Sequence, residues 1–389
     1  MRASSDRRRV RSGDHFMIGD VACAEAALAA GCQVFAGYPI TPATEIAEHM
    51  SHRLPMVGGY YMQMEDELAS MNAILGASCA GVRAMTATSG PGFSLMAENL
   101  GLGMMMEVPC VVVDIMRGGP STGMPTLTSQ GDVMQSRWGS HGDYEPVVYA
   151  PASVQEMFDL TIRCFNTADR YRVPTILLGD QMLGHMTGHL RIPPADEIPW
   201  VERPTRPPPE DPVPPPSSGN GAPPMAHAGE GHRLHFTGLT HDERGYPAID
   251  AAGSRQLLDR IVGKIRDHHS EIVEVEDYRL DGAEIAVVAF GSNSRSAREA
   301  VRRARADGIP VGMLRLVTLW PFAEEAIAEL SRQVRWILVP EINYGQIVHP
   351  VREYAECPVS LLPHAGGALH HPDDIVSAIR RRWLHEDRH

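Results

Sequence analysis

The sequence has little that would support a metal cluster or a membrane anchor. No apolar run in the 389 residues approaches 18 residues, so no transmembrane helix is predicted. Cysteine is scarce, and no pair has the C-x-x-C or other spacing typical of a metal site. This predicts that the chain carries no iron–sulfur cluster and no metal site of its own. The six cysteines are interpreted as small core residues of a cytoplasmic protein. They are Cys23, Cys32, Cys79, Cys110, Cys164 and Cys357.

The chain also has fewer basic than acidic residues, with 35 Lys and Arg against 48 Asp and Glu. The formal net charge is −13, which argues against general nucleic-acid affinity and leaves a basic partner protein as a candidate. The Arg-rich stretch 1–18 lacks the apolar segment of a secretory signal and is predicted to be a disordered lead-in. Hydrophobic residues make up 43% of the chain and charged residues 21%, as in an ordinary globular protein of two or three domains.

The most informative stretch is 63–99, where the pattern predicts a helix, a short buried strand, a sharp turn and a second helix. The strand is expected at 84–88, the turn at 89–92 and the second helix from Phe93. The acidic cluster 65–67 opens the first helix, where acids complement the positive end of the helix dipole. On local sequence alone, these acids are solvated helix-start residues. Open α/β sheets bind ligands at the carboxyl ends of their strands, so the turn is a candidate binding loop.

Two further residues stand in loops that follow predicted strands. Thr41 lies between two prolines after the strand 33–36, and local sequence predicts that its hydroxyl caps the next helix. Arg117 follows the buried strand 110–115 and is suited to holding a carboxylate bidentately, with a structural ion pair as the alternative. His141, in the long loop beyond it, is a candidate substrate contact, although a lone His is more often a hydrogen-bonded surface residue.

A proline-rich stretch divides the chain into two predicted domains. The buried strand patterns of the first half predict an α/β sheet of about five or six strands. The stretch 191–224 contains 13 of the 31 prolines and is interpreted as a semi-rigid spacer. Beyond it, strands and helices alternate as in a small doubly wound domain. The predicted parts are a lead-in at 1–18, an α/β domain at 19–190, a linker and connecting segment at 191–282, and a second α/β domain at 283–382.

Three polar clusters in the second half carry weaker signals. The turn 291–294, GSNS, joins a strand to a helix as phosphate-binding turns do, but it lacks the G-x-G-x-x-G spacing. The acidic and histidine residues at 241–243 have the composition of metal ligands, yet adjacent residues of this kind seldom converge on one ion. His370 and His371 are likewise assigned no ligand role.

Five motifs together resemble the α subunit of the 2-oxoacid:ferredoxin oxidoreductases. They are GYPITP (37–42), MEDE (64–67), TATSGPGFSLM (86–96), RGGPSTG (117–123) and VPEINYGQ (339–346). The resemblance covers nearly the whole chain. It implies the thiamine-diphosphate-binding fold, with a pyrimidine-type domain built on a parallel sheet covered by helices on both faces. It also implies a second α/β domain like the C-terminal domain of transketolase.

The resemblance assigns roles to individual residues. Glu67, the third acid of the cluster, would be the catalytic carboxylate that bonds to a pyrimidine nitrogen of thiamine diphosphate. Such a carboxylate favours the imino tautomer of the ring, and burial would raise its pKa and help it to share a proton. Thr41 and Arg117 would bind the carboxylate of the substrate. The pyrimidine pocket would be walled by Thr88, Ser89 and Gly90.

The family reaction is the oxidative decarboxylation of a 2-oxoacid with coenzyme A, giving an acyl-CoA, CO₂ and two electrons for ferredoxin. The resemblance places Mg²⁺, the diphosphate and a [4Fe–4S] cluster on a partner β subunit, with γ and δ subunits as further candidates. The lack of a G-D-G…N diphosphate motif in this chain agrees with that division. The expected substrate is 2-oxoglutarate. The alternatives are a branched-chain 2-oxoacid such as 2-ketoisovalerate, a non-catalytic scaffold subunit of the same fold, and a thiamine enzyme that acts alone.

Overall fold

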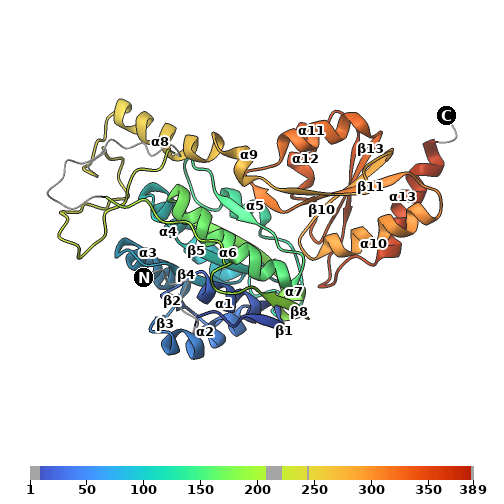
Figure 1. Ribbon diagram of the computed structural model, residues 1–389. Helices are drawn as coiled ribbons and strands as arrows, with labels where there is room; N and C mark the ends of the chain where they lie inside the picture. The colour runs from blue at the N-terminus through green and yellow to red at the C-terminus, as the bar shows by residue number, and fades with distance from the viewer. Residues whose placement is uncertain (1–8, 207–220, 243–244, 387–389) are drawn as a thin grey trace.

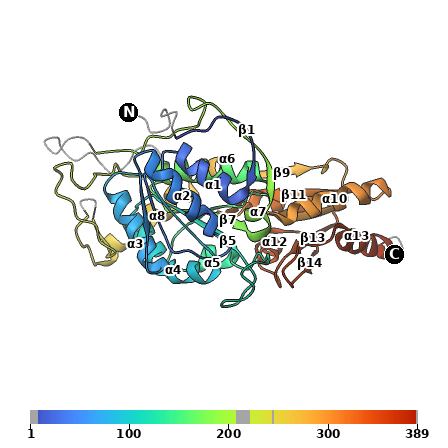
Figure 2. The same cartoon turned by 90° about the horizontal axis from the view of Figure 1, so that it is seen from below.

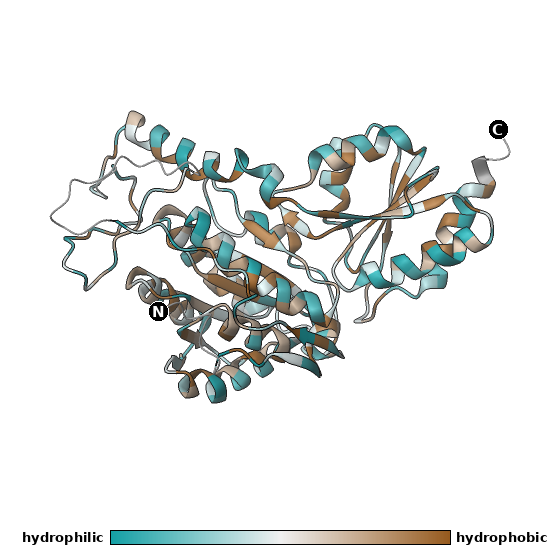
Figure 3. Cartoon of the chain, in the orientation of Figure 1, coloured by the Kyte–Doolittle hydropathy of each residue, from teal (hydrophilic) through white to brown (hydrophobic). Residues whose placement is uncertain are grey.

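The computed structural model describes residues 9–206, 221–242 and 245–386. Two α/β units lie side by side, and the C-terminal helix is at the far end of the second unit (Figures 1 and 2). The strands of the second unit are apolar, while the outer faces of its helices are polar (Figure 3). Within the described residues, no helix is both long and apolar enough to cross a membrane.

The first unit is built on a sheet of seven strands in the order β12-β6-β7-β5-β4-β2-β3. All neighbouring pairs are parallel except β12 and β6. The central strands are buried on both faces, which explains why their sequences read as unbroken apolar runs. The strands are β2 (Val34–Gly37), β3 (Tyr60–Gln63), β4 (Ala84–Thr88), β5 (Val111–Met116), β6 (Val147–Tyr149), β7 (Thr175–Asp180) and β12 (Thr318–Trp320). The sheet exceeds the expected five or six strands because β12 joins it from the second half of the chain.

Helices cover this sheet, with α1 packed on α6 and α3 packed on α4. The helices are α1 (Gly19–Ala29), α2 (Thr44–Met56), α3 (Glu67–Cys79), α4 (Gly90–Met105), α5 (Val133–Trp138), α6 (Val154–Tyr171) and α7 (Gln181–His185). The parallel sheet and its helices confirm the predicted fold class.

The stretch 1–18 contains ordered structure that the sequence analysis missed. Residues 1–8 lie outside the described part of the chain, but β1 (Gly13–Ile18) pairs antiparallel with β8 (Thr187–Ile192) over six residues. The expectation of disorder was wrong for this strand, because its partner lies about 170 residues further along the chain and no local pattern reveals the pairing.

The proline-rich segment was interpreted as a spacer, yet its described parts are attached to the first unit; residues 207–220 lie outside the described structure. Arg83 stacks on the ring of Trp200 with 3.9 Å between the guanidinium carbon and the ring centroid. Arg203 donates from Nε to Asp169 Oδ1 at 2.7 Å, and both side chains are buried. These contacts fix the segment against the first unit before it reaches α8 (Ala251–Arg266) and α9 (His269–Ile272).

The second unit has a five-stranded sheet in the order β14-β13-β10-β11-β9, parallel except for β9. Its strands are β9 (Val275–Tyr278), β10 (Ile285–Phe290), β11 (Val311–Leu316), β13 (Trp336–Glu341) and β14 (Val359–Pro363). Its helices are α10 (Asn293–Ala306), α11 (Glu324–Gln333), α12 (Val348–Tyr354) and α13 (Pro372–Glu386).

The GSNS turn joins the two units instead of presenting free donors. Ser292 donates from Oγ to Asp180 Oδ2 at 2.5 Å, and Asn293 donates from Nδ2 to the carbonyl of Pro340 at 3.0 Å. His370 is buried against Asn293, and burial lowers the pKa of this histidine to about 4. The polar side chains of the turn are therefore engaged in contacts within the protein.

A buried ion cluster attaches α8 to the first unit. Glu107 is 2% exposed and accepts hydrogen bonds from Lys264 Nζ at 3.0 Å and Arg260 at 2.9 Å. Burial opposes ionisation of this carboxyl, but the charges of Lys264, Arg172 and Arg260 hold its pKa at about 2. The charged form of Glu107 is thus stabilised only when the cluster is assembled.

Replacing Glu107 with Gln is expected to lower the free energy of unfolding at pH 7 by about 3 kcal/mol, because the buried cations lose their counter-charge. The pKa of Glu107 is lower in the folded state, so its contribution is complete above about pH 4.5 and is lost as the pH falls toward 2. Urea unfolding at several pH values checks both points. The control is Glu299→Gln, which removes a carboxylate from solvent-accessible pairs with Arg302 and Arg303 and should have a much smaller effect.

Candidate active site

The acidic cluster at the start of α3 separates into three different environments. Glu65 is exposed, whereas Asp66 is the helix N-cap and its carboxylate accepts from the backbone N–H of Ala69 at 2.7 Å. Glu67 is only 4% exposed. Burial raises the pKa of Glu67, and the nearby charge of Arg117 opposes this rise. Glu67 is therefore not a solvated helix-start residue, since capping is done by its neighbour.

The turn after β4 lies directly against Glu67. The helix α4 begins at Gly90, three residues earlier than the expected start at Phe93. A Cβ atom on Gly92 would lie 2.3 Å from Glu67 Oε1 and 2.2 Å from Thr88 Oγ1, so only glycine allows this approach. Glu67 and the end of β4 therefore lie together, and both are residues that the family resemblance assigned to one pocket.

Two hydroxyl groups at this turn are buried without a partner. Thr88 Oγ1 and Ser89 Oγ have no hydrogen-bond partner among the described residues. Ser89 occupies the N-cap position of α4, yet its side chain makes no capping hydrogen bond. A buried hydroxyl without a partner is costly, so these groups are suited to a ligand that supplies polar atoms.

Thr41 and Arg117 also lie together, but Thr41 is not a helix cap. The helix α2 begins at Thr44, because residues 40–43 form a tight turn in which the N–H of Ala43 donates to the carbonyl of Ile40 at 2.9 Å. The expectation of a capping role for Thr41 was wrong. Its carbonyl accepts from Arg117 NH1 at 2.7 Å.

Two backbone carbonyls fix the guanidinium of Arg117. NH1 donates to Thr41 and NH2 donates to the carbonyl of Thr122 at 2.9 Å, while Nε is buried without a partner. No ion pair to Arg117 occurs within the described residues, so the structural ion pair offered as an alternative is not observed there. An oriented cation with donors to spare is suited to binding an anion.

Two carboxylates next to Arg117 were not recognised from the sequence as site residues. Asp114 is fully buried within β5, and Asp132, which is half-buried, precedes α5. Burial and the charge of Asp132 raise the pKa of Asp114 well above its usual range, while burial raises the pKa of Asp132 to about 6. An acid inside the apolar run CVVVDI is the signal that could have identified Asp114.

A cleft of about 740 Å³ opens beside these residues, at the junction of the two units. Its lining includes Gly90, Arg117 and Asp132 from the first unit and Asn343, His364 and Gly367 from the second. His141 is exposed and does not line this cleft. Of the other polar residues considered, His241 contacts the carbonyl of Leu239, and Glu243 lies outside the described residues.

Comparison with known proteins shows to which family this chain belongs. The model of the thiamine-diphosphate-binding domain of pyruvate flavodoxin/ferredoxin oxidoreductases matches residues 25–258. The model of core domain II of pyruvate:ferredoxin oxidoreductase matches residues 283–375. The chain belongs to the 2-oxoacid:ferredoxin oxidoreductase family. It is a member of a family of oxidoreductases and contains that family's thiamine-diphosphate-binding domain.

Relatives in this family match the chain almost end to end. The 2-oxoglutarate synthase subunit KorA of Methanocaldococcus jannaschii is 50% identical over 94% of this chain and 98% of its own length. The ketoisovalerate oxidoreductase subunit VorB of Methanothermobacter thermautotrophicus is 38% identical over 93% of this chain and 96% of its own. The predicted membership in the family is thus confirmed.

Solved structures confirm the fold. The 2-oxoglutarate:ferredoxin oxidoreductase of Magnetococcus marinus, solved with 2-oxoglutarate, coenzyme A and succinyl-CoA bound, superposes with a TM-score of 0.89 at 32% identity. That match covers 95% of this chain and 65% of the solved chain, so this chain spans about two thirds of its length. A split-gene transketolase matches with a TM-score of 0.54 at 12% identity, which supports the transketolase-like fold alone.

Proposed function

We propose that this chain is the α subunit of a 2-oxoglutarate:ferredoxin oxidoreductase that depends on thiamine diphosphate. The reaction converts 2-oxoglutarate, coenzyme A and two oxidised ferredoxins into succinyl-CoA, CO₂ and two reduced ferredoxins, with release of a proton. The observation that carries the proposal is the buried carboxylate of Glu67, which lies against Gly92 beside two hydroxyl groups that have no partner.

The residues at the turn fit the pyrimidine half of the cofactor. Glu67 supplies a buried carboxyl group whose raised pKa suits proton sharing with a ring nitrogen. Thr88 and Ser89 would offer their two unpaired hydroxyl groups to the cofactor, and Gly90, which lines the cleft, follows them. When bound, thiamine diphosphate supplies a nucleophilic carbon and an electron sink for decarboxylation.

Arg117 and Thr41 are assigned to the carboxylate of the 2-oxoacid. The guanidinium is oriented before substrate binds, because the carbonyls of Thr41 and Thr122 already hold two of its N–H groups. Its remaining donors and its charge are available to an anion. Pre-orientation of this kind lowers the entropic cost of binding.

The diphosphate, Mg²⁺ and a [4Fe–4S] cluster are assigned to a partner β subunit. The six cysteines of this chain support that division, since all are free thiols and four are fully buried. Burial raises the pKa of those four thiols, which disfavours the thiolate form that a cluster requires. Ferredoxin and coenzyme A would complete the set of partners, with γ and δ subunits as further components.

The choice of 2-oxoglutarate rests on the relatives. Four archaeal proteins named 2-oxoglutarate synthase subunit KorA are 41–50% identical to this chain, against 37–38% for two proteins named ketoisovalerate oxidoreductase subunit VorB. The second candidate function is therefore oxidation of 2-ketoisovalerate by the same site.

Co-purification with the β subunit tests the proposal. The complex should contain thiamine and iron–sulfur absorbance, and should reduce a viologen dye with 2-oxoglutarate and coenzyme A. Activity confined to 2-ketoisovalerate would keep the mechanism and exclude the substrate. A colourless chain without cofactor or activity, when co-expressed with its partner, would favour a scaffold role.

Arg117→Lys is expected to raise the KM for the 2-oxoacid by about tenfold or more, because an ammonium group loses the planar fork that meets both carbonyls and the substrate. Steady-state kinetics of the complex measure this effect. The control is Arg335→Lys, at an exposed pair with Glu284, which should leave KM unchanged. An unchanged KM for Arg117→Lys would remove the carboxylate-binding role.

A further inference from the structure

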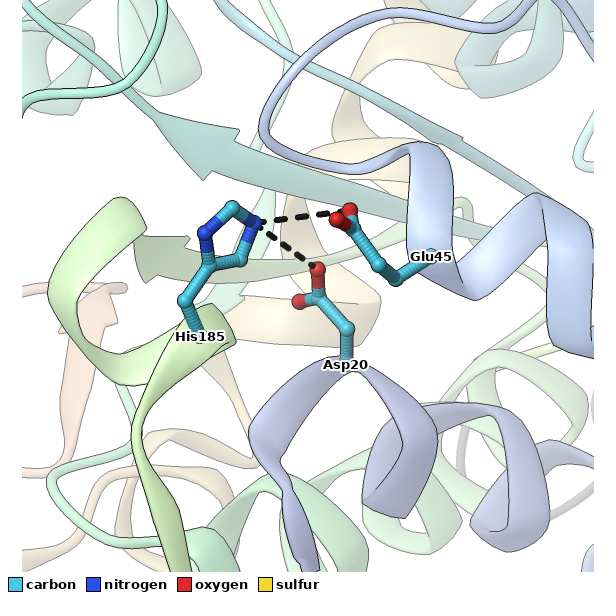
Figure 4. Close-up of side chains that lie close together, drawn as sticks. All are labelled: Asp20, Glu45 and His185. Carbon is cyan, nitrogen blue, oxygen red and sulfur yellow. Dashed lines mark ion pairs between the residues drawn. The ribbon is translucent and has the colours of Figure 1, made fainter.

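A second group of ionisable side chains lies behind the loop that carries Thr41. Asp20 in α1, Glu45 in α2 and His185 in α7 point toward one another (Figure 4). His185 Nε2 is 3.4 Å from Glu45 Oε2 and 3.9 Å from Asp20 Oδ2. One ligand atom from each residue lies within 4.8 Å of the other two. The three helices thus bring two carboxylates and an imidazole to one point.

Asp20 is the least expected member of this group. Its side chain is 0% exposed, and neither carboxylate oxygen has a hydrogen-bond partner among the described residues. Although it lies in the first turn of α1, the N-cap of that helix is Ile18. A Cβ on Gly184 would come within 2.6 Å of Asp20 Oδ1, so glycine there lets α7 approach the carboxylate. A buried carboxylate without donors is compensated either by a positive group or by protonation.

We infer that Asp20, Glu45 and His185 bind a divalent transition-metal ion of the Zn²⁺ class, with the carbonyl of Pro42 as a fourth ligand. Zinc bonds of about 2.0–2.1 Å in a tetrahedron place neighbouring ligand atoms about 3.3 Å apart. His185 Nε2 is 3.4 Å from Glu45 Oε2 and 3.2 Å from the carbonyl oxygen of Pro42, close to that spacing. An imidazole ligand favours zinc over Mg²⁺ or Ca²⁺, which take oxygen ligands.

The surroundings of His185 also suit a metal ligand. A metal-bound Nε2 leaves the proton on Nδ1, which needs an acceptor in the second shell of the site. The side-chain amide of Gln181 lies 3.4 Å from Nδ1, and turning that amide by half a rotation presents its oxygen there. Gln181 would then orient His185, four residues later in α7, as a metal ligand.

The ion would stabilise the structure of a loop and would take no part in the reaction. Pro42 follows Thr41, whose carbonyl holds Arg117, so an ion at Pro42 would fix the loop 37–42 relative to α1 and α7. This role goes beyond the proposed reaction and does not depend on the substrate or on the partner subunit.

Zinc titration of the full-length chain, after removal of metals with a chelator, tests the inference. Calorimetry should give one equivalent of bound Zn²⁺, and Zn²⁺ should raise the midpoint of thermal unfolding. Asp20→Asn keeps the shape of the side chain, and it should weaken Zn²⁺ binding at least tenfold and remove the thermal shift. His185→Gln should do the same. The control is Asp14→Asn, at the exposed pair with His189 (3.1 Å), which should bind Zn²⁺ as the wild type does.

The alternative is a protonated His185 that neutralises the two carboxylates without a metal. In that case Zn²⁺ binding would be absent, or equal in the wild type and Asp20→Asn, and either result overturns the inference. Circular dichroism separates loss of a ligand from loss of fold. Asp20→Asn removes an ionisable group from a buried position, so without metal it should be at least as stable as the wild type.

Discussion

Replacing Glu67 with Gln is expected to lower kcat by about two to four orders of magnitude, while the complex with the β subunit assembles normally. The amide has nearly the same shape as the carboxyl group, so the contact with Gly92 is preserved. It cannot take or give the proton that the cofactor must exchange. The loss should therefore appear in kcat more than in KM. Dye reduction with saturating 2-oxoglutarate and coenzyme A measures it.

The matched control is Glu65→Gln, two residues earlier in the same acidic cluster. Glu65 is exposed and Glu67 is 4% exposed, so the two variants make the same chemical change in different environments. The control should retain wild-type kcat. Equal activity of the two variants would contradict the catalytic assignment, and failure of Glu67→Gln to assemble would indicate a structural role.

Strands buried on both faces were predictable, because they bury continuous apolar runs. β4 and β5 begin and end within a residue of the positions expected from such runs. The change from strand to helix after β4 was also predictable from the glycine and proline residues at 90–92, although α4 begins at Gly90 and includes the residues expected to form a turn. The candidate site residues, in contrast, were named from five motifs that resemble a family, and local patterns alone favoured other roles for several of them.

What could not be predicted depends on contacts between distant parts of the chain. The strand β1 needs β8 as its partner, and Arg203 needs Asp169 to attach the proline-rich segment. Thr41 between two prolines has the sequence of a helix cap, but the carbonyl that Arg117 holds belongs to a turn before α2. The environment of a carboxyl group is equally non-local. Glu65 and Glu67 are chemically identical, but Glu65 is exposed while Glu67 is buried against Gly92 and near Arg117.

Gly92→Ala is expected to reduce activity by about 10²-fold or more, because a Cβ at this position would collide with two site residues. It would lie 2.3 Å from Glu67 Oε1, 2.5 Å from Glu67 Cδ and 2.2 Å from Thr88 Oγ1. The carboxylate is the movable end of a side chain, so the fold can accommodate the methyl group by displacing it. The stability cost should be about 1–3 kcal/mol, as for other overpacked sites.

The control for this variant is Gly76→Ala, in the exposed part of α3. A Cβ on Gly76 meets no atom within 4 Å, so the substitution should stabilise the helix by about 0.5–1 kcal/mol and leave kcat unchanged. Kinetics of the complex and urea unfolding of each variant give both quantities. Full activity in Gly92→Ala would show that the position of the Glu67 carboxylate is not critical, and would weaken the catalytic assignment. Both glycines lie in helices but only Gly92 lies against Glu67, so the contrast between the two variants separates the effect of displacing that carboxylate from any general effect of a methyl group on a helix.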